Sequence, residues 1–119
     1  MTNQEIAKRL HKLVKAGEYN RAYDELFSPE ATAKEPQLAE MGFGEVKGIE
    51  AVKQKVTALS AGMAELKSRT MSEPIVTGTH IAFTNIVNGT LKDGNAFNLS
   101  EICLYKMEGG KIVSEEFIY

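Results

Sequence analysis

Apolar residues recur at helical spacing in three segments of the first half of the chain. The first segment begins at a capping box, Thr2 with Glu5, and ends before Gly17, a residue type that commonly terminates helices. A second helix is expected at about residues 18–27 and a third at about 49–61. The pattern therefore predicts three helices in the N-terminal half.

The chain between the second and third helices shows no helical pattern. Residues 31–35 are expected to form a short extended segment that is closed by Pro36. Residues 37–48 contain three glycines and are expected to form a mobile loop.

The second half is rich in β-branched and aromatic residues, which favour strands. Strands are expected at residues 64–76, 79–91, 96–107 and 111–119. Turn sequences separate them, including Asp93-Gly94 and Gly109-Gly110, so an antiparallel meander is expected. Pro74 predicts a bulge or a frayed stretch in the first strand. Helices followed by strands indicate an α+β fold.

Composition narrows the class of protein. The 119 residues suit one domain, residues 1–119, and the apolar fraction of 43% is that of a globular protein. A net charge of −2 without a Lys/Arg run argues against a nucleic-acid partner. No signal peptide or membrane-spanning stretch is recognised, and Cys103 is the only cysteine. A cytoplasmic protein is expected.

One face of the meander is expected to lie away from the helices. Its predicted residues include the apolar side chains of Ile102, Leu104, Ile112 and Ile118. This face is too apolar for open solvent, so a homodimer that buries it is expected.

Four sequence pieces in this order resemble the nuclear-transport-factor-2-like superfamily. They are Lys15-Ala16-Gly17-Glu18, the segment from Leu26 to Ala31, the segment from Val46 to Val52, and Gly110-Lys111-Ile112-Val113. Within the superfamily the chain looks most like the SnoaL-like proteins, which are named after polyketide cyclase members. The resemblance implies a cystatin-like, cone-shaped barrel whose sheet wraps around a pocket roofed by helices, and a small apolar ligand in that pocket.

The same superfamily includes ketosteroid isomerase, whose catalytic carboxylate precedes a proline at the end of the first strand. Glu35-Pro36 matches that position. The two oxyanion donors of that enzyme would fall at Leu10 and near Cys103, and neither residue is the acid or phenol required. Steroid isomerisation by that mechanism is therefore not expected.

The last hairpin decides which acidic side chains face the pocket. A three-residue turn pairs Met107 with Lys111, places Cys103 opposite Glu115, and places Glu101 opposite Phe117. A two-residue turn would instead bring Glu116 to that face.

Glu35, Glu101 and Glu115 are the candidate catalytic residues, because carboxyl groups near one another on an apolar face acquire pKa values suited to proton transfer. Glu35 would be the base, in an isomerase, cyclase or hydrolase that acts on an apolar carbonyl compound. The candidate ligand-binding residues are Tyr23, Tyr105, Tyr119, Phe43 and Phe117. Met41 and Phe43 would be the apolar contacts of a lid. No spacing indicates a metal site or a cofactor, so neither is expected.

Structural roles compete with each of these assignments. Glu101 and Glu115 could each pair with a neighbouring basic residue or a backbone amide, and Cys103 could be a small buried apolar residue. His11 and His80 are expected to be structural. A non-catalytic interaction module remains the alternative, with the cone plugged by Phe83, Phe97 and Phe117. An open pocket with convergent carboxylates would favour the binding or catalytic reading.

Overall fold

The computed structural model describes residues 1–119, and the helices lie close to their expected bounds. They are α1 (Asn3–Lys15), α2 (Tyr19–Leu26) and α3 (Ile49–Ala61), with a 3-10 helix η1 at Pro36–Met41. The strands are β1 (Phe27–Lys34), β2 (Glu45–Lys47), β3 (Met63–Met71), β4 (Ile75–Val76), β5 (His80–Leu91), β6 (Ala96–Glu108) and β7 (Lys111–Ile118). The capping box at Thr2 is formed as predicted.

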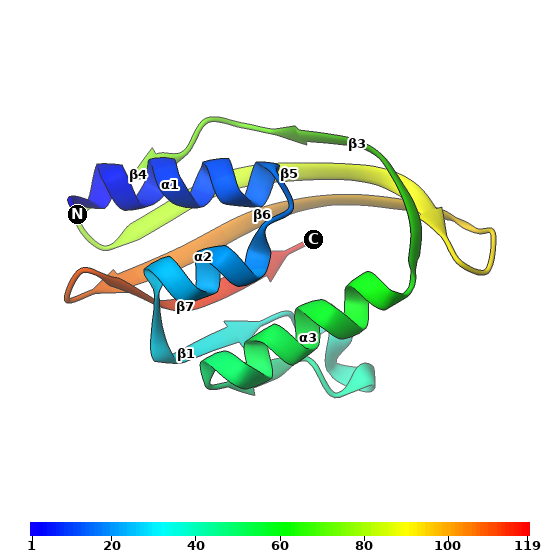
Figure 1. The fold of residues 1–119 in the computed structure, drawn as a ribbon, viewed down its shortest axis with the longest axis horizontal. Coiled ribbons are helices and arrows are strands. Elements are labelled where there is room, and N and C mark those ends of the chain that lie inside the picture. The colour runs from blue at the N-terminus through cyan, green and yellow to red at the C-terminus, as the bar shows by residue number, and fades with distance from the viewer.

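The strands form one curved, open sheet in the order β2-β1-β7-β6-β5-β3, and β4 pairs with β5. The three helices cover one side of this sheet, with α1 and α2 over one end and α3 below (Figure 1). The connections from β5 to β7 are antiparallel, as the turn sequences predicted, whereas β1 joins β7 in parallel. The result is an α+β, cone-shaped architecture in which the sheet does not close into a barrel.

The core lies between the helices and the concave face of the sheet. Eighteen buried apolar residues form it, among them Leu10 and Leu13 of α1, Phe27 of β1, and Phe83 of β5. Ile112 is also fully buried in this core, so its expected position on the free face is wrong. Ile102 and Ile118 do lie exposed on the outer face.

Two expectations for the chain before α3 are also wrong. β1 begins directly at the end of α2 and extends the short strand expected at 31–35, because Ser28-Pro29 ends the helix but not the extended chain. The segment 37–48 is not an irregular loop: it contains η1 and β2, and β2 pairs with β1. As Pro74 predicted, the stretch at 64–76 is interrupted, between β3 and β4.

The last hairpin has a two-residue turn, not the three-residue turn that pairs Met107 with Lys111. Glu108 pairs with Lys111, and Gly109 and Gly110 both adopt positive φ values. A register shift follows, between the pairs Lys106–Ser114 and Met107–Ile112. A two-residue turn without a bulge would point Glu116 to the core, and this bulge reverses which side chains of β7 point there. Glu115 therefore faces the core and Glu116 does not.

The predicted cross-strand partners are consequently wrong by two residues. Tyr105, not Cys103, lies opposite Glu115, and Cys103, not Glu101, lies opposite Phe117.

Candidate functional site

Three buried carboxyl groups converge beneath the helices. Glu35 directly follows β1, Glu101 lies on β6, and Glu115 lies on β7, and their exposed fractions are 6%, 8% and 2%. Carboxyl groups are rarely buried to this extent unless they are paired or hydrogen-bonded. Each of the three has such a partner, described below.

Both oxygens of Glu35 are engaged. Oε1 lies 2.8 Å from Nζ of Lys55, and Oε2 accepts a hydrogen bond of 2.5 Å from the hydroxyl of Tyr119. Gln37 of η1 donates a hydrogen bond to the main-chain oxygen of Tyr119 and so holds that residue in place. Burial raises the pKa of the Tyr119 phenol, and the hydrogen bond to Glu35 and the negative charge of Glu35 raise it further.

Lys55 is the main residue that the sequence analysis missed. It lies on α3 with an exposed fraction of 1%, and its Nζ sits 4.7 Å from the centre of the Phe117 ring. The ammonium forms an ion pair with Glu35 but makes no hydrogen bond of good geometry. A signal was present: Lys55 falls on the apolar stripe that includes Val52 and Val56, where a charged side chain must be buried.

Glu115 has the most strongly perturbed carboxyl of the site. Burial raises its pKa to about 7, although the positive charge of Lys55 and a hydrogen bond from Tyr23 act in the opposite direction. The Tyr23 hydroxyl donates to Oε1 of Glu115 over 3.0 Å. The negative charges of Glu35 and Glu101 raise the pKa further. A carboxyl with this pKa exchanges protons near neutral pH.

Glu101 has one engaged oxygen and one free oxygen. Oε1 accepts hydrogen bonds from Nδ2 of Asn85 at 3.1 Å and from the Cys103 thiol at 3.5 Å, whereas Oε2 accepts none. Burial raises the pKa of Glu101, and the nearby charge of Glu35 contributes to that increase. The Oδ1 atom of Asn85 is buried without a partner. Asn85 was also missed, although it interrupts the inward-facing apolar series of β5.

The remaining candidates divide between core and rim. Tyr105 is buried and packs against three rings, those of Phe27, Phe83 and Phe117. Tyr23 is a core residue whose hydroxyl reaches the site, and Tyr119 is the most exposed of the three candidate tyrosines at 42%. Phe43 is half-buried between η1 and β2, and no hydrogen bond or ring contact joins it to the acidic groups.

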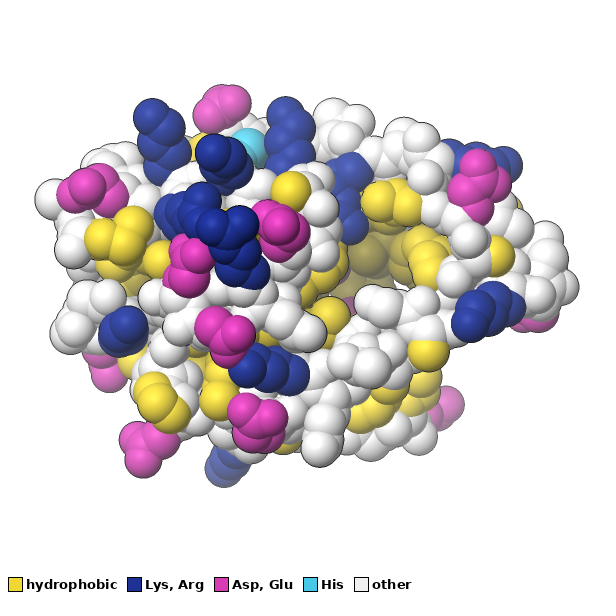
Figure 2. All heavy atoms as spheres, viewed as in Figure 1, with side chains coloured by type: hydrophobic (Ala, Val, Ile, Leu, Met, Phe, Trp, Pro, Cys, Tyr) yellow, Lys and Arg dark blue, Asp and Glu magenta, His cyan; other side chains and the backbone are white.

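The alternative reading expects three phenylalanines to plug the cone. Phe83 belongs to the core, and Phe97 and Phe117 are half-buried. Figure 2 shows a hollow with apolar side chains in its depth, beside the C-terminal end of the chain and between the helices and β3. Tyr119 is the C-terminal residue and donates a hydrogen bond to Glu35, so the Glu35 end of the acidic cluster lies beside this hollow.

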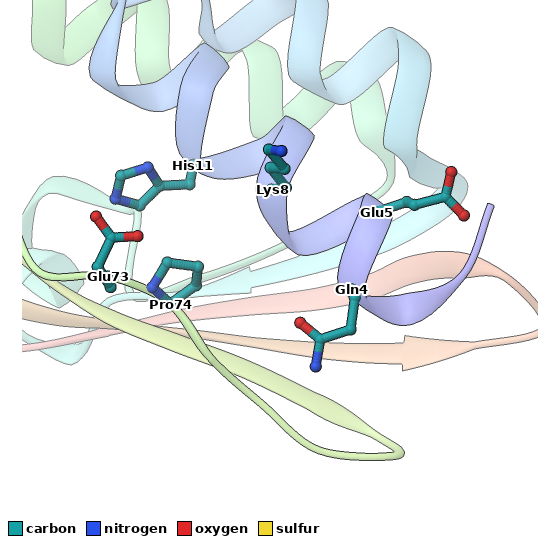
Figure 3. Close-up of a pocket in the computed structure, with 6 residues that line it drawn as sticks. All are labelled: Gln4, Glu5, Lys8, His11, Glu73 and Pro74. Atoms are coloured by element: carbon teal, nitrogen blue, oxygen red, sulfur yellow. The ribbon is translucent and has the colours of Figure 1, made fainter.

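Two other depressions are lined by residues outside the acidic cluster. One runs along α1 and is lined by Gln4, Glu5, Lys8, His11, Glu73 and Pro74 (Figure 3). There His11 makes a hydrogen bond of 2.9 Å to the main-chain oxygen of Ser72, so the histidine joins α1 to the chain between β3 and β4. The other lies around η1 and β2. Neither contains a buried carboxyl group.

Two further properties bear on the classes of site. No group of three or more His, Cys, Asp or Glu side chains is arranged to hold a metal ion. None of the helices combines the length and the apolar character needed to cross a bilayer.

Comparison with solved structures gives many proteins of the same fold. A protein of Mesorhizobium loti, provisionally named a SnoaL-like polyketide cyclase, superposes with a TM-score of 0.86 at 27% identity, over 100% of both chains. A protein of Xanthomonas campestris with a cystatin-like fold gives 0.77 at 20% identity, over 99% of this chain and 90% of that one. TerC, co-crystallised with polyporic acid, gives 0.78 at 15% identity, over 98% and 90%.

Sequence comparison identifies the family. No curated protein gave a significant match. The sequence model of the SnoaL-like domain, in contrast, matches residues 1–119, which is the whole chain. The chain therefore belongs to the SnoaL-like family, within the nuclear-transport-factor-2-like superfamily.

Proposed function

We propose that this protein binds a small, mostly apolar carbonyl compound in the hollow and moves a proton on it without a cofactor. Membership of the SnoaL-like family supports small-molecule binding. The observation that carries the proposal is the buried set of Glu35, Lys55, Glu101 and Glu115 at an apolar hollow. Acidic groups with raised pKa values beside a buried cation are typical of sites for proton transfer.

Glu101 is the residue best placed to act as the base. Its Oε2 accepts no hydrogen bond, and it keeps the largest exposure of the three acids. Glu35, the base expected from the sequence, has both oxygens engaged and would have to lose a partner first. In the proposed step, the C–H bond next to the carbonyl breaks, the proton moves to Glu101, and the electron pair moves to the carbonyl oxygen as an enolate.

Lys55 would stabilise the enolate. A buried ammonium with no hydrogen bond of good geometry can direct a proton to a developing negative charge, and it acts more strongly there than in water. Glu35 and Tyr119 would position Lys55 by holding it through the carboxylate. Where a double bond is conjugated with the enolate, return of the proton from Glu101 to the far carbon of that double bond completes an isomerisation. Attack of the enolate carbon on a second carbonyl closes a ring, and the alkoxide that forms takes the proton from Glu101.

The alternative is a binding module that performs no chemistry. Its support is the outer face of the sheet, where Ile86, Ile102 and Ile118 are exposed by 40%, 47% and 44%. We propose that a second copy of the chain covers this face, since contiguous exposed apolar side chains on a sheet favour association. Such a homodimer is what the module reading expects, and it does not exclude the enzyme.

Deuterium exchange on a simple ketone tests the chemistry. β-Tetralone has acidic hydrogens next to its carbonyl, and NMR in deuterated buffer follows their replacement. Glu101→Gln should slow protein-dependent exchange by roughly 10²-fold or more, because a positioned base contributes that much to rate. Glu116→Gln, on the opposite face of β7, is the matched control and should exchange at the wild-type rate.

The outcomes separate the two functions. Exchange at equal rates in the wild type and Glu101→Gln would contradict the assigned base. Binding of β-tetralone without any protein-dependent exchange would favour the non-catalytic module. Failure of β-tetralone to bind at all would count against a ketone site in the hollow.

A further inference from the structure

Arg69 is the arginine of this chain that has no acidic partner. Arg9 and Arg21 both form salt bridges with Glu25, at 2.8 and 3.0 Å. Arg69, on β3, forms no salt bridge. Its Nη1 donates a hydrogen bond to the main-chain oxygen of Val14 at the end of α1, and its Nε is buried without a partner. A half-buried cation without a counter-charge keeps a desolvation cost that a bound anion would offset.

The guanidinium points toward the helices and therefore toward the hollow. The hydrogen bond to Val14 places it on the helical side of the sheet, and it lies 5.3 Å from the centre of the Tyr19 ring of α2. Figure 2 shows basic side chains at the rim of the hollow on the side where β3 passes.

The strand register places Arg69 at a fixed offset from Glu101. Arg69 pairs with Val87 across β3 and β5, and Asn85, two residues before Val87, pairs with Glu101 across β5 and β6. Two strand spacings and two residues along a strand separate their Cα atoms by roughly 12 Å. Val87 and its partner Leu99 lie between them and provide an apolar floor.

Tyr19 lies beside Arg69, with the guanidinium 5.3 Å from the centre of its ring. Burial raises the pKa of its phenol, the positive charge of Arg69 lowers that pKa, and the negative charge of Glu101 raises it. Unlike Tyr23 and Tyr119, Tyr19 donates no hydrogen bond to a carboxylate of the chain. Its hydroxyl is thus a second donor on the Arg69 side of the hollow.

We propose that Arg69 and Tyr19 form a carboxylate-binding subsite, so that the ligand is an elongated apolar acid with its carbonyl group at the Glu101 end. This inference rests on the proposed function and adds the ligand's second polar group. The planar guanidinium matches a carboxylate through two parallel hydrogen bonds. Glu101 and Glu115 would repel a carboxylate at the other end, so the charges fix one orientation of the ligand.

Matched ligands test the subsite. Benzoylpropionate carries an apolar ring, a ketone and a carboxylate, and its methyl ester differs only in the loss of the charge. Calorimetric titration at low ionic strength should give the acid roughly tenfold or more tighter binding to the wild type than the ester. Arg69→Gln should bring the two affinities together, because only binding of the acid becomes weaker. Arg69→Lys should keep part of the preference for the acid. Lys67→Gln, at an exposed position of the same strand, is the control and should keep the full preference.

Each result decides one of the two proposals. Equal affinity for acid and ester in the wild type overturns the subsite and leaves ketone binding intact. A preference that persists in Arg69→Gln also overturns it, since another group then holds the carboxylate. Binding of neither compound overturns the subsite together with the proposed function. Thermal unfolding of each variant confirms that the folded protein was titrated, and Arg69→Lys serves as the test if Arg69→Gln does not fold.

Discussion

Nζ of Lys55 lies 2.8 Å from Oε1 of Glu35, and both side chains are almost fully buried. The pair joins α3 to the end of β1, beneath the hollow. Its cost is the removal of two charges from water, which the attraction between them offsets only while both are present. The arrangement therefore holds a cation in place at the site. In return, the stability of the fold depends on both partners being present.

Removal of one partner should destabilise the fold more than removal of both. Glu35→Gln leaves an ammonium buried without its counter-charge, which should lower the free energy of unfolding by about 3–5 kcal/mol. The double variant Glu35→Gln with Lys55→Met should recover part of that loss, because no uncompensated charge remains. Urea denaturation of the wild type, both single variants and the double variant gives the coupling energy.

The neighbouring pair Lys53–Asp24 is a matched control on the same helix. Nζ of Lys53 lies 2.5 Å from Asp24, but the Asp24 side chain is 65% exposed. Exposed pairs of this kind contribute about 0–1 kcal/mol. A coupling energy for Lys55 and Glu35 as small as that of Lys53 and Asp24 would show that the buried pair is well solvated.

Stability should fall as the pH rises through neutrality because of Glu115. Burial raises its folded pKa from 4.5 to about 7, so the folded state binds the proton more tightly than the unfolded state does. The contribution of the protonated group is fully present below about pH 4.5 and is lost as the pH rises through about 7. The shift in pKa corresponds to a contribution of about 3 kcal/mol to the free energy of unfolding.

Glu115→Gln should remove this dependence. Urea denaturation between about pH 5 and about pH 8.5 should show a decrease in wild-type stability that is smaller in the variant, so that Glu115→Gln is the more stable protein at the alkaline end. Glu101, whose pKa is also raised by burial, accounts for the decrease that remains. Glu116→Gln, which changes the neighbouring residue on the other face, should retain the wild-type slope. Parallel slopes for all three proteins would mean that Glu115 is ionised throughout this range.

The helices and most strands were predictable because their signals are local. Thr2 with Glu5 and the Asp93-Gly94 turn each specify their structure within a few residues. The facing of β7 was not predictable in this way. The turn at Gly109-Gly110 gives one facing, and the bulge near Val113 reverses it, yet no glycine or proline marks that bulge. Packing of Glu115 beneath Tyr23 involves residues 92 positions apart.

The candidate site was half-predictable for a related reason. Carboxyl groups attract attention in a sequence as candidates for chemistry, and all three proposed acids are buried together. Lys55 and Asn85 interrupt apolar patterns, a signal that could have been used but was not. Arg69 had no such signal: β3 is an edge strand with mostly exposed residues, and only the tertiary structure shows that this side chain turns under α1.

Gly89 should not tolerate a side chain. A Cβ atom at this position of β5 would lie 2.3 Å from the main-chain oxygen of Glu65 and 3.2 Å from Cε of Met63. The oxygen belongs to β3, which pairs with β5 here, so it can move only by separating the strands. Gly89→Ala should therefore destabilise the protein by roughly 1–3 kcal/mol in urea denaturation. Gly78→Ala, where a Cβ meets no atom within 4 Å, should change stability little; equal effects would contradict the close approach.

Ile102→Lys should abolish the proposed homodimer. Ile102 lies on the outer face of β6, directly opposite Ile118 of β7, and both are exposed in the single chain. A lysine there would place two like charges near each other across a two-fold interface and remove the apolar contact. Sedimentation velocity should show a dimer for the wild type and a monomer for Ile102→Lys. Leu66→Lys changes an equally exposed apolar residue on the edge strand β3 and should remain dimeric. A wild type that sediments as a monomer would mean that this apolar face is stable in solvent. A dimer that persists in Ile102→Lys would place the interface on another surface.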